Sequence, residues 1–339
     1  MRVISHVLVA VFAWLLSAMT VSAVEPVRVI YDTDLGGDID DALALAVIHA
    51  LETRGECRLL AITLSEHFRR NAAFADVLNT FYGRPDIPIG LVREDPQAEA
   101  SRYAGKVADA QDGAAPRYPH DLVEETPQDA VELLRSTLAA QPDGSVVMVM
   151  VGPSTNVARF LESPGDAHSP QTGRELAAQK CKLLSLMAGM FSPVGRKKEW
   201  NVYQDLDASR KVWAQWPTPI VASGSEIGEA ITYPGATLPG DCRYVTHHPV
   251  REAYESWGKM PYDRPAWDLT SVLIAVRPDR GYFGLSDPGT IHVDDHSVTQ
   301  FTTTPAGRHR YLTATAQQIA QVREALVQLV SQPPAAQRP

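Results

Sequence analysis

Five aspartates lie within ten positions near the start of the chain, from Asp32 to Asp41. An apolar run, Val27–Tyr31, precedes them and has the β-branched character of a buried parallel strand. The stretch ALALAVIHAL, a strong helix former without Pro or Gly, follows them. The acids are therefore predicted to lie on a glycine-containing loop between a strand and a helix. In open α/β sheets, ligands bind at the carboxyl ends of strands.

Carboxylates packed this closely repel one another unless a cation neutralises them, and Ca²⁺ or Mg²⁺ prefers oxygen ligands of this kind. The alternative is a solvated acidic turn in which Asp40 or Asp41 caps the helix. A cap requires only one aspartate, so the cluster favours a cation site. An EF-hand loop is excluded, because with Asp32 at its first position the required bidentate Glu would fall on Leu43.

The stretch DTDLGGDIDDALAL resembles the signature of the nucleoside hydrolases, the calcium-dependent N-ribohydrolases, whose usual form is a strand ending in DxDxGxDDAxAL. Two extra residues lengthen the loop here, a variant common among the secreted bacterial members of the family. The resemblance implies a single α/β domain with a mostly parallel, Rossmann-like central sheet flanked by helices. It also implies that a nucleoside or related N-riboside is hydrolysed at its N-glycosidic bond, with Ca²⁺ as the cofactor.

Four positions match the calcium ligands of the family: Asp34 and Asp41 in the loop, the carbonyl of Val151, and Asp268. Val151 ends an apolar run in a segment similar to the family's GPLTNLA, and Asp268 lies just before an apolar helix. Taken alone, these two distant positions would fit a strand-to-helix turn and a helix cap. Together with the acidic loop they favour ligation. The resemblance further implies that Asp34 is the general base that accepts a proton from water.

Further matches imply contacts with the substrate. Asp40 would hydrogen-bond a ribose hydroxyl, and Met187, at the end of the run LLSLM, would lie along the ribose, although a place in the core is an equal alternative for this Met. Glu199 and Asn201, in EWN, would hold the 5′-hydroxyl, since side chains two residues apart point the same way from an extended strand. Asp32 is expected to support the loop from behind the ligands.

Two positions depart from the family. The residue before the late aspartate is His in the best-known members, where it is proposed to protonate the leaving purine. Here it is Trp267, which is expected to stack on a base or line the pocket. The polar Asn that follows the second strand falls near Phe68, and the neighbouring His67 is a candidate replacement. These departures motivate a rival interpretation, a non-catalytic ribose- or nucleoside-binding protein on the same fold.

A phosphatase of the haloacid dehalogenase type is a less favoured alternative. It would use Asp32 as its nucleophile, because that class also begins with a strand followed by two Asp spaced by one residue. However, Thr or Val is expected where Gly36 stands here.

The first 23 residues have the pattern of a secretory signal peptide: an early Arg2, an apolar stretch from Val7 to Leu16 and a small-residue cleavage site ending at Ala23. The apolar stretch is too short for a membrane anchor, and no later segment offers about 18 consecutive apolar residues. The mature protein is therefore expected to be soluble and secreted or periplasmic, with no membrane contact after cleavage.

Composition adds further limits. The net charge of −9 argues against nucleic acid as a partner. The three cysteines Cys57, Cys181 and Cys242 fit no zinc motif, and three buried free thiols are favoured over one disulfide. Members of the family are often dimers or tetramers, so a homo-oligomer is one expectation, but no part of the sequence locates an interface. Residues 24–331 are predicted to form one domain, and the Pro/Gln-rich tail 332–339 to be disordered.

Strand-like and helix-like segments alternate along the chain, which predicts a mostly parallel sheet with helices on both faces. The strand candidates are Val27–Tyr31, Leu59–Leu64, Val146–Val151, Leu183–Met187 and Pro219–Ser223. The helix candidates are Asp41–Thr53, Asn71–Phe81, Pro127–Gln141, Asn156–Glu162, Leu206–Gln215, Ser271–Val276 and Ala316–Val330. Residues 94–125 are expected near the mouth of the site, 163–175 to form a loop, and 297–302 with 308–312 to pair as a hairpin.

Overall fold

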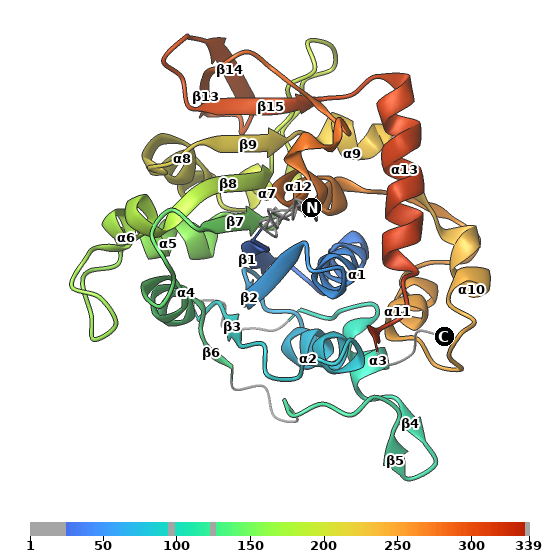
Figure 1. Cartoon of the computed structure of the whole chain (residues 1–339). Helices are drawn as coiled ribbons and strands as arrows, with labels where there is room; N and C mark the ends of the chain where they lie inside the picture. The colour runs from blue at the N-terminus through green and yellow to red at the C-terminus, as the bar shows by residue number, and fades with distance from the viewer. Residues whose placement is uncertain (1–24, 94–98, 123–126, 336–339) are drawn as a thin grey trace, which may run out of the picture.

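A sheet of 11 strands crosses the described part of the chain, residues 25–93, 99–122 and 127–335 of this computed structural model (Figure 1). Its strands lie in the order β14 (Thr299–Thr303), β13 (Gly289–Val293), β15 (His309–Thr313), β9 (Ile220–Ser223), β8 (Cys181–Met187), β7 (Val146–Met150), β1 (Val27–Thr33), β2 (Cys57–Leu64), β3 (Ile89–Leu91) and β6 (Gln128–Asp129), with β12 (Gly284–Leu285) paired to β15. The predicted signal peptide and residues 336–339 of the predicted tail lie outside the described residues.

The pairings from β15 through β9, β8, β7, β1, β2 and β3 to β6 are all parallel, whereas β13 pairs antiparallel with both β14 and β15. The predicted mostly parallel sheet is therefore confirmed. Parallel strands buried on both faces read as continuous apolar runs. All five residues of β7 are buried, as this rule requires.

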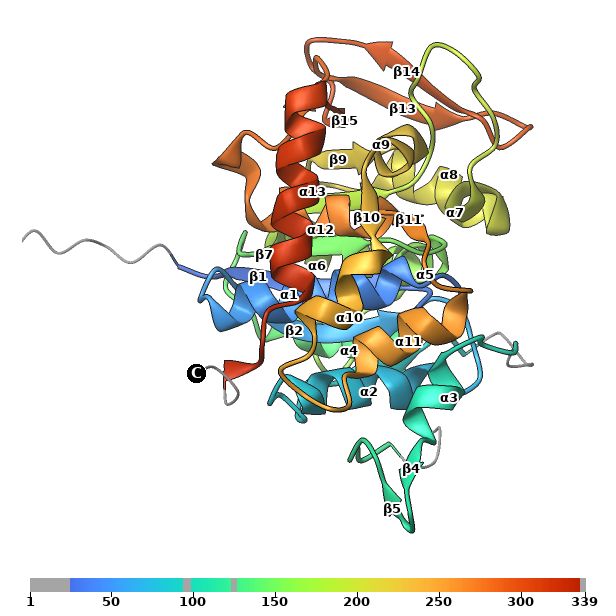
Figure 2. The ribbon, with the colours of Figure 1, turned by 90° about the vertical axis from the view of Figure 1, so that its right-hand side faces the viewer.

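Helices cover both faces of the sheet (Figures 1 and 2). One face carries α1 (Asp40–Thr53), α2 (Asn71–Phe81), α12 (Trp267–Val276) and α13 (Ala316–Val330), and the other carries α4 (Ala130–Ala139), α5 (Thr155–Glu162), α6 (Gly173–Lys180) and α8 (Leu206–Gln215). Strand β1 contributes to both cores, because successive side chains point to opposite faces. Val29 and Tyr31 lie in the core with α1, and Ile30 lies in the core with α4 and α5.

The remaining elements are short. They are α3 (Ala104–Ala108), β4 (Gln111–Asp112), β5 (Ala115–Pro116), α7 (Trp200–Gln204), α9 (Ser225–Ala230), β10 (Thr232–Pro234), η1 (Gly235–Thr237), α10 (Leu238–Asp241), α11 (Pro249–Trp257), β11 (Asp263–Pro265) and η2 (Pro278–Arg280). No helix in the described ranges is both long and apolar enough to cross a membrane. The three cysteines are buried and free, as predicted.

Two local predictions are wrong. Strands β14 and β15 exist, but they do not pair with each other, because β13 lies between them and Gly289 is opposite both Thr303 and His309. A side chain at Gly289 would clash with the Phe301 ring, which explains the glycine. The predicted loop 163–175 ends early, since α6 begins at Gly173 behind a capping box formed by Thr172 and Glu175.

Candidate active site

The acidic loop joins β1 to α1 at the carboxyl end of the sheet. Asp34 follows β1 directly, and Asp40 and Asp41 are the first two residues of α1. Gly36 has a φ of +115°, a conformation that favours glycine. A Cβ on Gly36 would lie 2.7 Å from the Cβ of Phe68, so the aromatic side chain at this position packs directly on the loop. Phe68, which departs from the family's polar residue, therefore packs against the glycines of the acidic loop.

Described residues of the segment predicted to lie near the mouth of the site, 94–125, bind the same loop. The Tyr103 hydroxyl accepts a hydrogen bond from the Gly36 amide (2.8 Å) and donates one to the Asp38 carbonyl (2.6 Å). The Ser101 hydroxyl donates to the Gly36 carbonyl (2.8 Å). Glu99, two residues earlier, lines the pocket beside the loop. The expectation that part of residues 94–125 lies at the mouth of the site is confirmed for these described residues.

Three carboxylates meet at the start of α1. One oxygen each from Asp40, Asp41 and Asp268 lies within 4.8 Å of the others, and all three side chains are buried. The Asp268 amide donates to an Asp40 oxygen (3.1 Å), and Thr33 donates to Asp41. Asp34 is not one of this group of three but lines the same pocket. Its predicted role as a metal ligand stays a prediction.

Neither acidic segment acts as a helix cap. The N-cap of α1 is Ile39 and that of α12 is Ala266, and neither has a side-chain capping bond. Helix α12 begins at Trp267, four residues before the predicted start, which places Asp268 in its first turn. The capping alternative is therefore wrong for Asp40, Asp41 and Asp268, and their carboxylates remain available to a ligand.

The pKa values of these three carboxylates and of Asp34 are shifted in the same direction. These four side chains are called the carboxylate cluster. Burial, followed by the charge of a neighbouring carboxylate, raises the pKa of Asp34, Asp40, Asp41 and Asp268 well above the ordinary range. The neighbouring charge comes from Asp41 for Asp34 and from Asp40 for Asp268. Such like charges in a buried site are stabilised by a bound cation, and Ca²⁺ takes carboxylate and carbonyl oxygens together.

The end of β7 lies against the loop. The Val151 amide donates to the Asp32 carbonyl (2.8 Å), and the Val151 carbonyl accepts from the Asn201 side-chain amide (2.6 Å). A Cβ on Gly152 would lie 2.7 Å from the Asp34 amide, so glycine permits this close approach. A carbonyl oxygen has two lone pairs, so Val151 can accept from Asn201 and still bind a cation.

Asp32 supports the loop from inside the sheet. One of its oxygens accepts hydrogen bonds from the Thr63 hydroxyl (2.6 Å) and the Asn156 side-chain amide (2.9 Å). Burial raises the pKa of Asp32 to about 7. The Asn156 contact was not predicted, because it joins residues 124 positions apart in the sequence. The N-cap of α5 is Ser154.

Glu199 and Asn201 do not lie on an extended strand, so that part of the prediction is wrong. Glu199 is the N-cap of the short helix α7, and its carboxylate accepts from the amides of Gly189 (3.0 Å), Asn201 (3.0 Å) and Val202 (3.2 Å). Burial raises the pKa of Glu199 to about 7. The Asn201 side-chain amide also donates to the Met187 carbonyl (3.0 Å). The pair therefore holds the strand ends together, and both residues line the pocket.

Met187, Glu199 and Asn201 line a pocket of about 760 Å³, together with the carboxylates of Asp34, Asp40, Asp41 and Asp268. Aromatic side chains line much of the rest: Phe68, Trp200, Tyr203, Trp257 and Trp267. Cationic side chains also line it: Arg102, Lys197, Lys198 and Arg264. Every residue predicted as a cation ligand or a substrate contact thus lines the pocket, whereas His67, the candidate replacement for the family's Asn, is not among the lining residues. Trp257 and Arg264 were not predicted, because Arg264 reaches the acidic loop only by a contact 226 residues apart in sequence.

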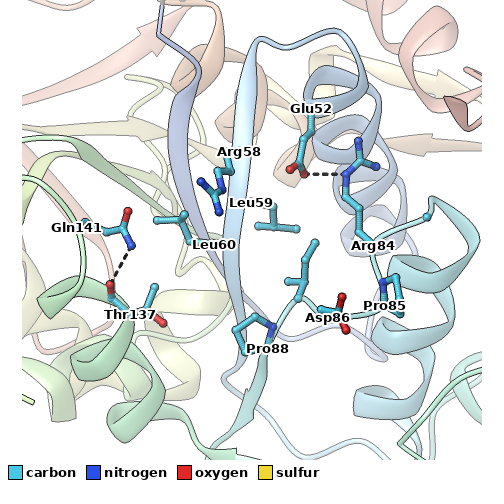
Figure 3. Close-up of a pocket in the computed structure, with 12 residues that line it drawn as sticks. Glu52, Arg58, Leu59, Leu60, Arg84, Pro85, Asp86, Pro88, Thr137 and Gln141 are labelled. Carbon is cyan, nitrogen blue, oxygen red and sulfur yellow. Dashed lines mark hydrogen bonds and ion pairs between the residues drawn. The ribbon is translucent and has the colours of Figure 1, made fainter.

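A second pocket, of about 470 Å³, lies at the opposite end of β2, around Arg58 (Figure 3). Its most buried acid, Glu52, already forms an ion pair with Arg84, with Nε and Oε2 3.1 Å apart. The polar contact between Gln141 and Thr137 is local to one stretch of chain. Among the described residues, this pocket therefore lacks the group of neighbouring buried carboxylates that lines the first.

The sequence of the chain is similar to that of known proteins. Residues 29–316 match the family described as inosine-uridine preferring nucleoside hydrolase. The chain is 27% identical over 273 residues to an uncharacterised protein of Schizosaccharomyces pombe, covering 74% of this chain and 81% of that protein. It is 29% identical over 202 residues to the pyrimidine-specific ribonucleoside hydrolase RihA of Citrobacter koseri, covering 59% of this chain and 60% of that protein.

Solved structures share the fold. A plant nucleoside hydrolase, PpNRh1, superposes with a TM-score of 0.64 at 21% identity and covers 91% of this chain and 100% of its own. A purine-preferring ribonucleoside hydrolase from Gardnerella vaginalis has a TM-score of 0.67 at 16% identity, covering 90% and 98%. The predicted enzyme class, an N-glycosidic bond hydrolase, is confirmed at the level of the family, and the phosphatase alternative is set aside. The chain belongs to the inosine-uridine preferring nucleoside hydrolase family.

Proposed function

We propose that the protein hydrolyses the N-glycosidic bond of a ribonucleoside or a related N-riboside, with Ca²⁺ as the cofactor. The observation that carries this proposal is the set of four buried carboxylates that line the pocket, Asp34, Asp40, Asp41 and Asp268. Among the described residues, no ion pair joins any of them to an Arg, Lys or His side chain. Buried carboxylates that lack a cationic partner are costly, and this cost supports a divalent cation as the occupant that we propose.

The donor set fits such an ion. Asp34, Asp41, Asp268 and the Val151 carbonyl would hold it, and the closeness of Asp40 to Asp41 and Asp268 adds a further carboxylate. All are hard oxygen donors, which suits Ca²⁺. When bound, the ion would supply Lewis acidity that lowers the pKa of a water molecule and attracts ribose hydroxyls.

The side chains divide the remaining work. Asp34 accepts the proton of the attacking water as general base. Asp40 accepts a hydrogen bond from a ribose hydroxyl. Positive charge develops on the sugar ring as the glycosidic bond breaks, and the surrounding carboxylates stabilise it. Met187 lies along the ribose, and Asn201, fixed by its bonds to Val151 and Met187, presents its remaining oxygen toward the 5′ side.

The test is a panel of purine and pyrimidine nucleosides incubated with the protein, with free ribose detected as reducing sugar, in the presence and absence of a chelator. Release that stops on chelation supports the proposal. The rival is a binding protein that has lost turnover, and Trp267 favours it because its indole N–H is bonded to the Ser225 carbonyl (3.0 Å). Binding of ribosides without release of base from any member of the panel would favour the rival.

We also propose that the protein is exported, with residues 1–23 removed, and that it acts on small ribosides outside the cytoplasm. The support is the sequence pattern of the N-terminus. Purified protein from the periplasm or medium should begin after Ala23 when its N-terminus is sequenced. Exported protein that begins at Met1 would contradict cleavage.

A further inference from the structure

The pocket lacks the group expected to assist the leaving base. As the glycosidic bond breaks, the base nitrogen gains the bonding electron pair, and an electropositive donor is needed to stabilise it. Trp267 stands where the family's proposed acid would be, and its single N–H is already used on Ser225. The N–H of Trp257 is also used, on the Gly37 carbonyl (3.3 Å). Among the described residues that line the pocket, none is a histidine.

Arg264 is placed to fill this role. It lies on β11, whose register pairs it with Tyr233 of β10, and the chain enters α12 three residues later at Trp267. Its Nε donates to an Asp38 oxygen (2.8 Å), and its Nη2 bonds the other oxygen of the same carboxylate. One edge of the guanidinium is therefore fixed by the acidic loop. Among the described residues, no hydrogen bond involves Nη1.

The aromatic wall fixes the guanidinium further. Its Cζ lies 4.3 Å from the ring centroid of Trp257 and 5.0 Å from that of Trp267. The Arg264 side chain is 23% exposed, and that of Asp38 28%. A bidentate carboxylate and two aromatic faces restrict the side chain strongly, and little conformational entropy remains to be lost when it binds a ligand.

The other cations of the pocket are placed differently. Lys197 is 59% exposed and pairs with Glu229, and the Nζ of Lys198 lies over the Tyr203 ring at 4.3 Å. Both lysines directly precede Glu199, on the side proposed for the 5′-hydroxyl. Arg264, by contrast, lies over the ring of Trp267, the residue that occupies the position of the family's proposed acid.

We propose that Arg264 donates hydrogen bonds from Nη1 to the departing base and stabilises its negative charge, in place of a general acid. This inference rests on the proposed function. Water oxygen bonds to C1′ and its proton passes to Asp34, while the C1′–N bond breaks with its electron pair retained by the base nitrogen. The guanidinium stays protonated throughout, because an arginine side chain does not lose its proton in proteins. The base anion takes a proton from solvent water, and Asp34 returns its proton to solvent.

The experiment compares two substrates whose leaving groups differ in their need for assistance. One is the nucleoside that the wild-type protein cleaves best, and the other is 4-nitrophenyl β-D-ribofuranoside, whose leaving group departs as a stable anion. Arg264→Gln should lower kcat/KM on the nucleoside by about 10²- to 10³-fold, the cost of one preorganised donor, and on the nitrophenyl riboside by less than about 3-fold. Arg264→Lys keeps the charge without the fork and should recover part of the loss.

Asp38→Asn leaves the arginine in place but removes its anionic partner. Its kcat/KM on the nucleoside should fall by less than that of Arg264→Gln, and again by more than its kcat/KM on the nitrophenyl riboside. This variant tests whether the guanidinium must be held in place as well as be present. Arg102→Gln is the matched control. Arg102 also lies over Trp257, with Cζ 5.3 Å from the ring centroid, but we assign it no contact with the base. It should change both substrates by the same factor, as should Tyr203→Phe.

Each contrary result has a distinct meaning. Equal losses on both substrates in Arg264→Gln, with bound calcium and melting temperature retained, would mean that Arg264 only shapes the pocket, and would overturn the inference. A loss confined to the nucleoside in Tyr203→Phe would transfer the role to Tyr203. If the wild-type protein cleaves the nitrophenyl riboside but no nucleoside, Arg264 does not suffice as the donor. If it cleaves neither, the proposed function itself fails.

Discussion

Carboxylates at the two ends of helix α1 and strand β2 have pKa values shifted in opposite directions. At the carboxyl end of the sheet, Asp34, Asp40, Asp41 and Asp268 are buried together, and burial raises the pKa of each. At the other end, Glu56 bonds both oxygens to Arg277 at 2.6 Å, and this contact lowers its pKa.

The same residue type therefore has two meanings in one molecule. Where an arginine is supplied, as for Glu56 with Arg277, the acid has its charge partner within the chain and serves the fold. Glu52 also pairs with an arginine, Arg84, around the second pocket, although burial still raises its pKa (Figure 3). Where none is supplied, as for the four acids at the start of α1, the charges have no cationic partner within the described residues, and we propose that a cation supplies it. A group of charges without partners is a stronger sign of function than the presence of acids or of a pocket.

The largest effect is expected at Asp34. Asp34→Asn keeps the size and one oxygen but cannot accept a proton, and turnover at saturating Ca²⁺ should fall by about 10²- to 10⁴-fold. Bound metal must be measured in the same sample, because the ligand also loses its charge. Asp86→Asn, the same change in the second pocket, is the control and should leave turnover unaltered. Wild-type turnover in a calcium-loaded Asp34→Asn protein would refute the mechanism.

Removing a carboxylate from the cluster should weaken calcium binding. After dialysis the protein should retain about one Ca²⁺ per chain, and added Ca²⁺ should raise the melting temperature. Loss of a residue that only supports a metal ligand raises a metal's Kd by about 10- to 100-fold. Asp41→Ala removes a proposed ligand itself, so the Kd for Ca²⁺ should rise by more than this. Titration calorimetry measures it, with Glu52→Gln as the control. Unchanged affinity in Asp41→Ala would show that the cluster is not the cation site.

The two ends should also give pH effects of opposite sign. The acids of the cluster have raised pKa values, so their stabilising protonation is complete below the unfolded value of about 4 and is lost as pH rises. The metal-free protein should therefore melt at a lower temperature as pH rises toward 8, and Ca²⁺ should reverse this trend. Glu56, whose pKa is lowered, contributes above about pH 4.5 and loses its contribution as pH falls.

Melting curves between pH 3 and 8, with chelator and with Ca²⁺, separate these contributions. Glu56→Gln should flatten only the acid side of the profile, and Asp268→Asn only the neutral side of the metal-free profile. A metal-free protein whose stability rises from pH 5 to 8 would contradict the charge arrangement described for the cluster.

The smallest effect is expected at the paired end. Glu52→Gln removes one charge of an ion pair whose side chains are each 19% exposed. Burial raises the pKa of Glu52 and offsets the attraction of Arg84, so the free energy of unfolding should change by less than about 1 kcal/mol. Nucleoside turnover and calcium affinity should stay within about 2-fold of wild type, because this acid lies at the far end of α1 from the cluster. A large loss of activity would mean that the two ends are coupled.

Local sequence signals predicted the regular elements well. The bounds of α2, α8 and α13 match the predicted ranges, because their apolar periodicity and end signals are contained within each segment. The pairing of β13 between β14 and β15 could not be predicted, since it depends on which strand edge is free once β15 has joined β9. The helix α6 was missed although its capping box is visible in the sequence.

The site divides in the same way. The acidic loop and Asp268 were predicted because the motif is dense in one chemical type and resembles a family signature. The packing of Phe68 on Gly36 and the ion pair of Asp38 with Arg264 were not, because each depends on distant segments meeting in space. The conformation around Glu199 was misjudged, since the sequence of a five-residue helix resembles that of a short strand.

The burial of α1 has a consequence for biosynthesis. Every residue from Asp40 to Leu51 is buried, and the helices that cover it, α12 and α13, begin only at Trp267 and Ala316. During most of translation, the apolar helix α1 is therefore present while the helices that bury it are still missing. We expect nascent chains that stop before residue 267 to aggregate or to require a chaperone, and the assembled pocket to be among the last parts of the protein to form.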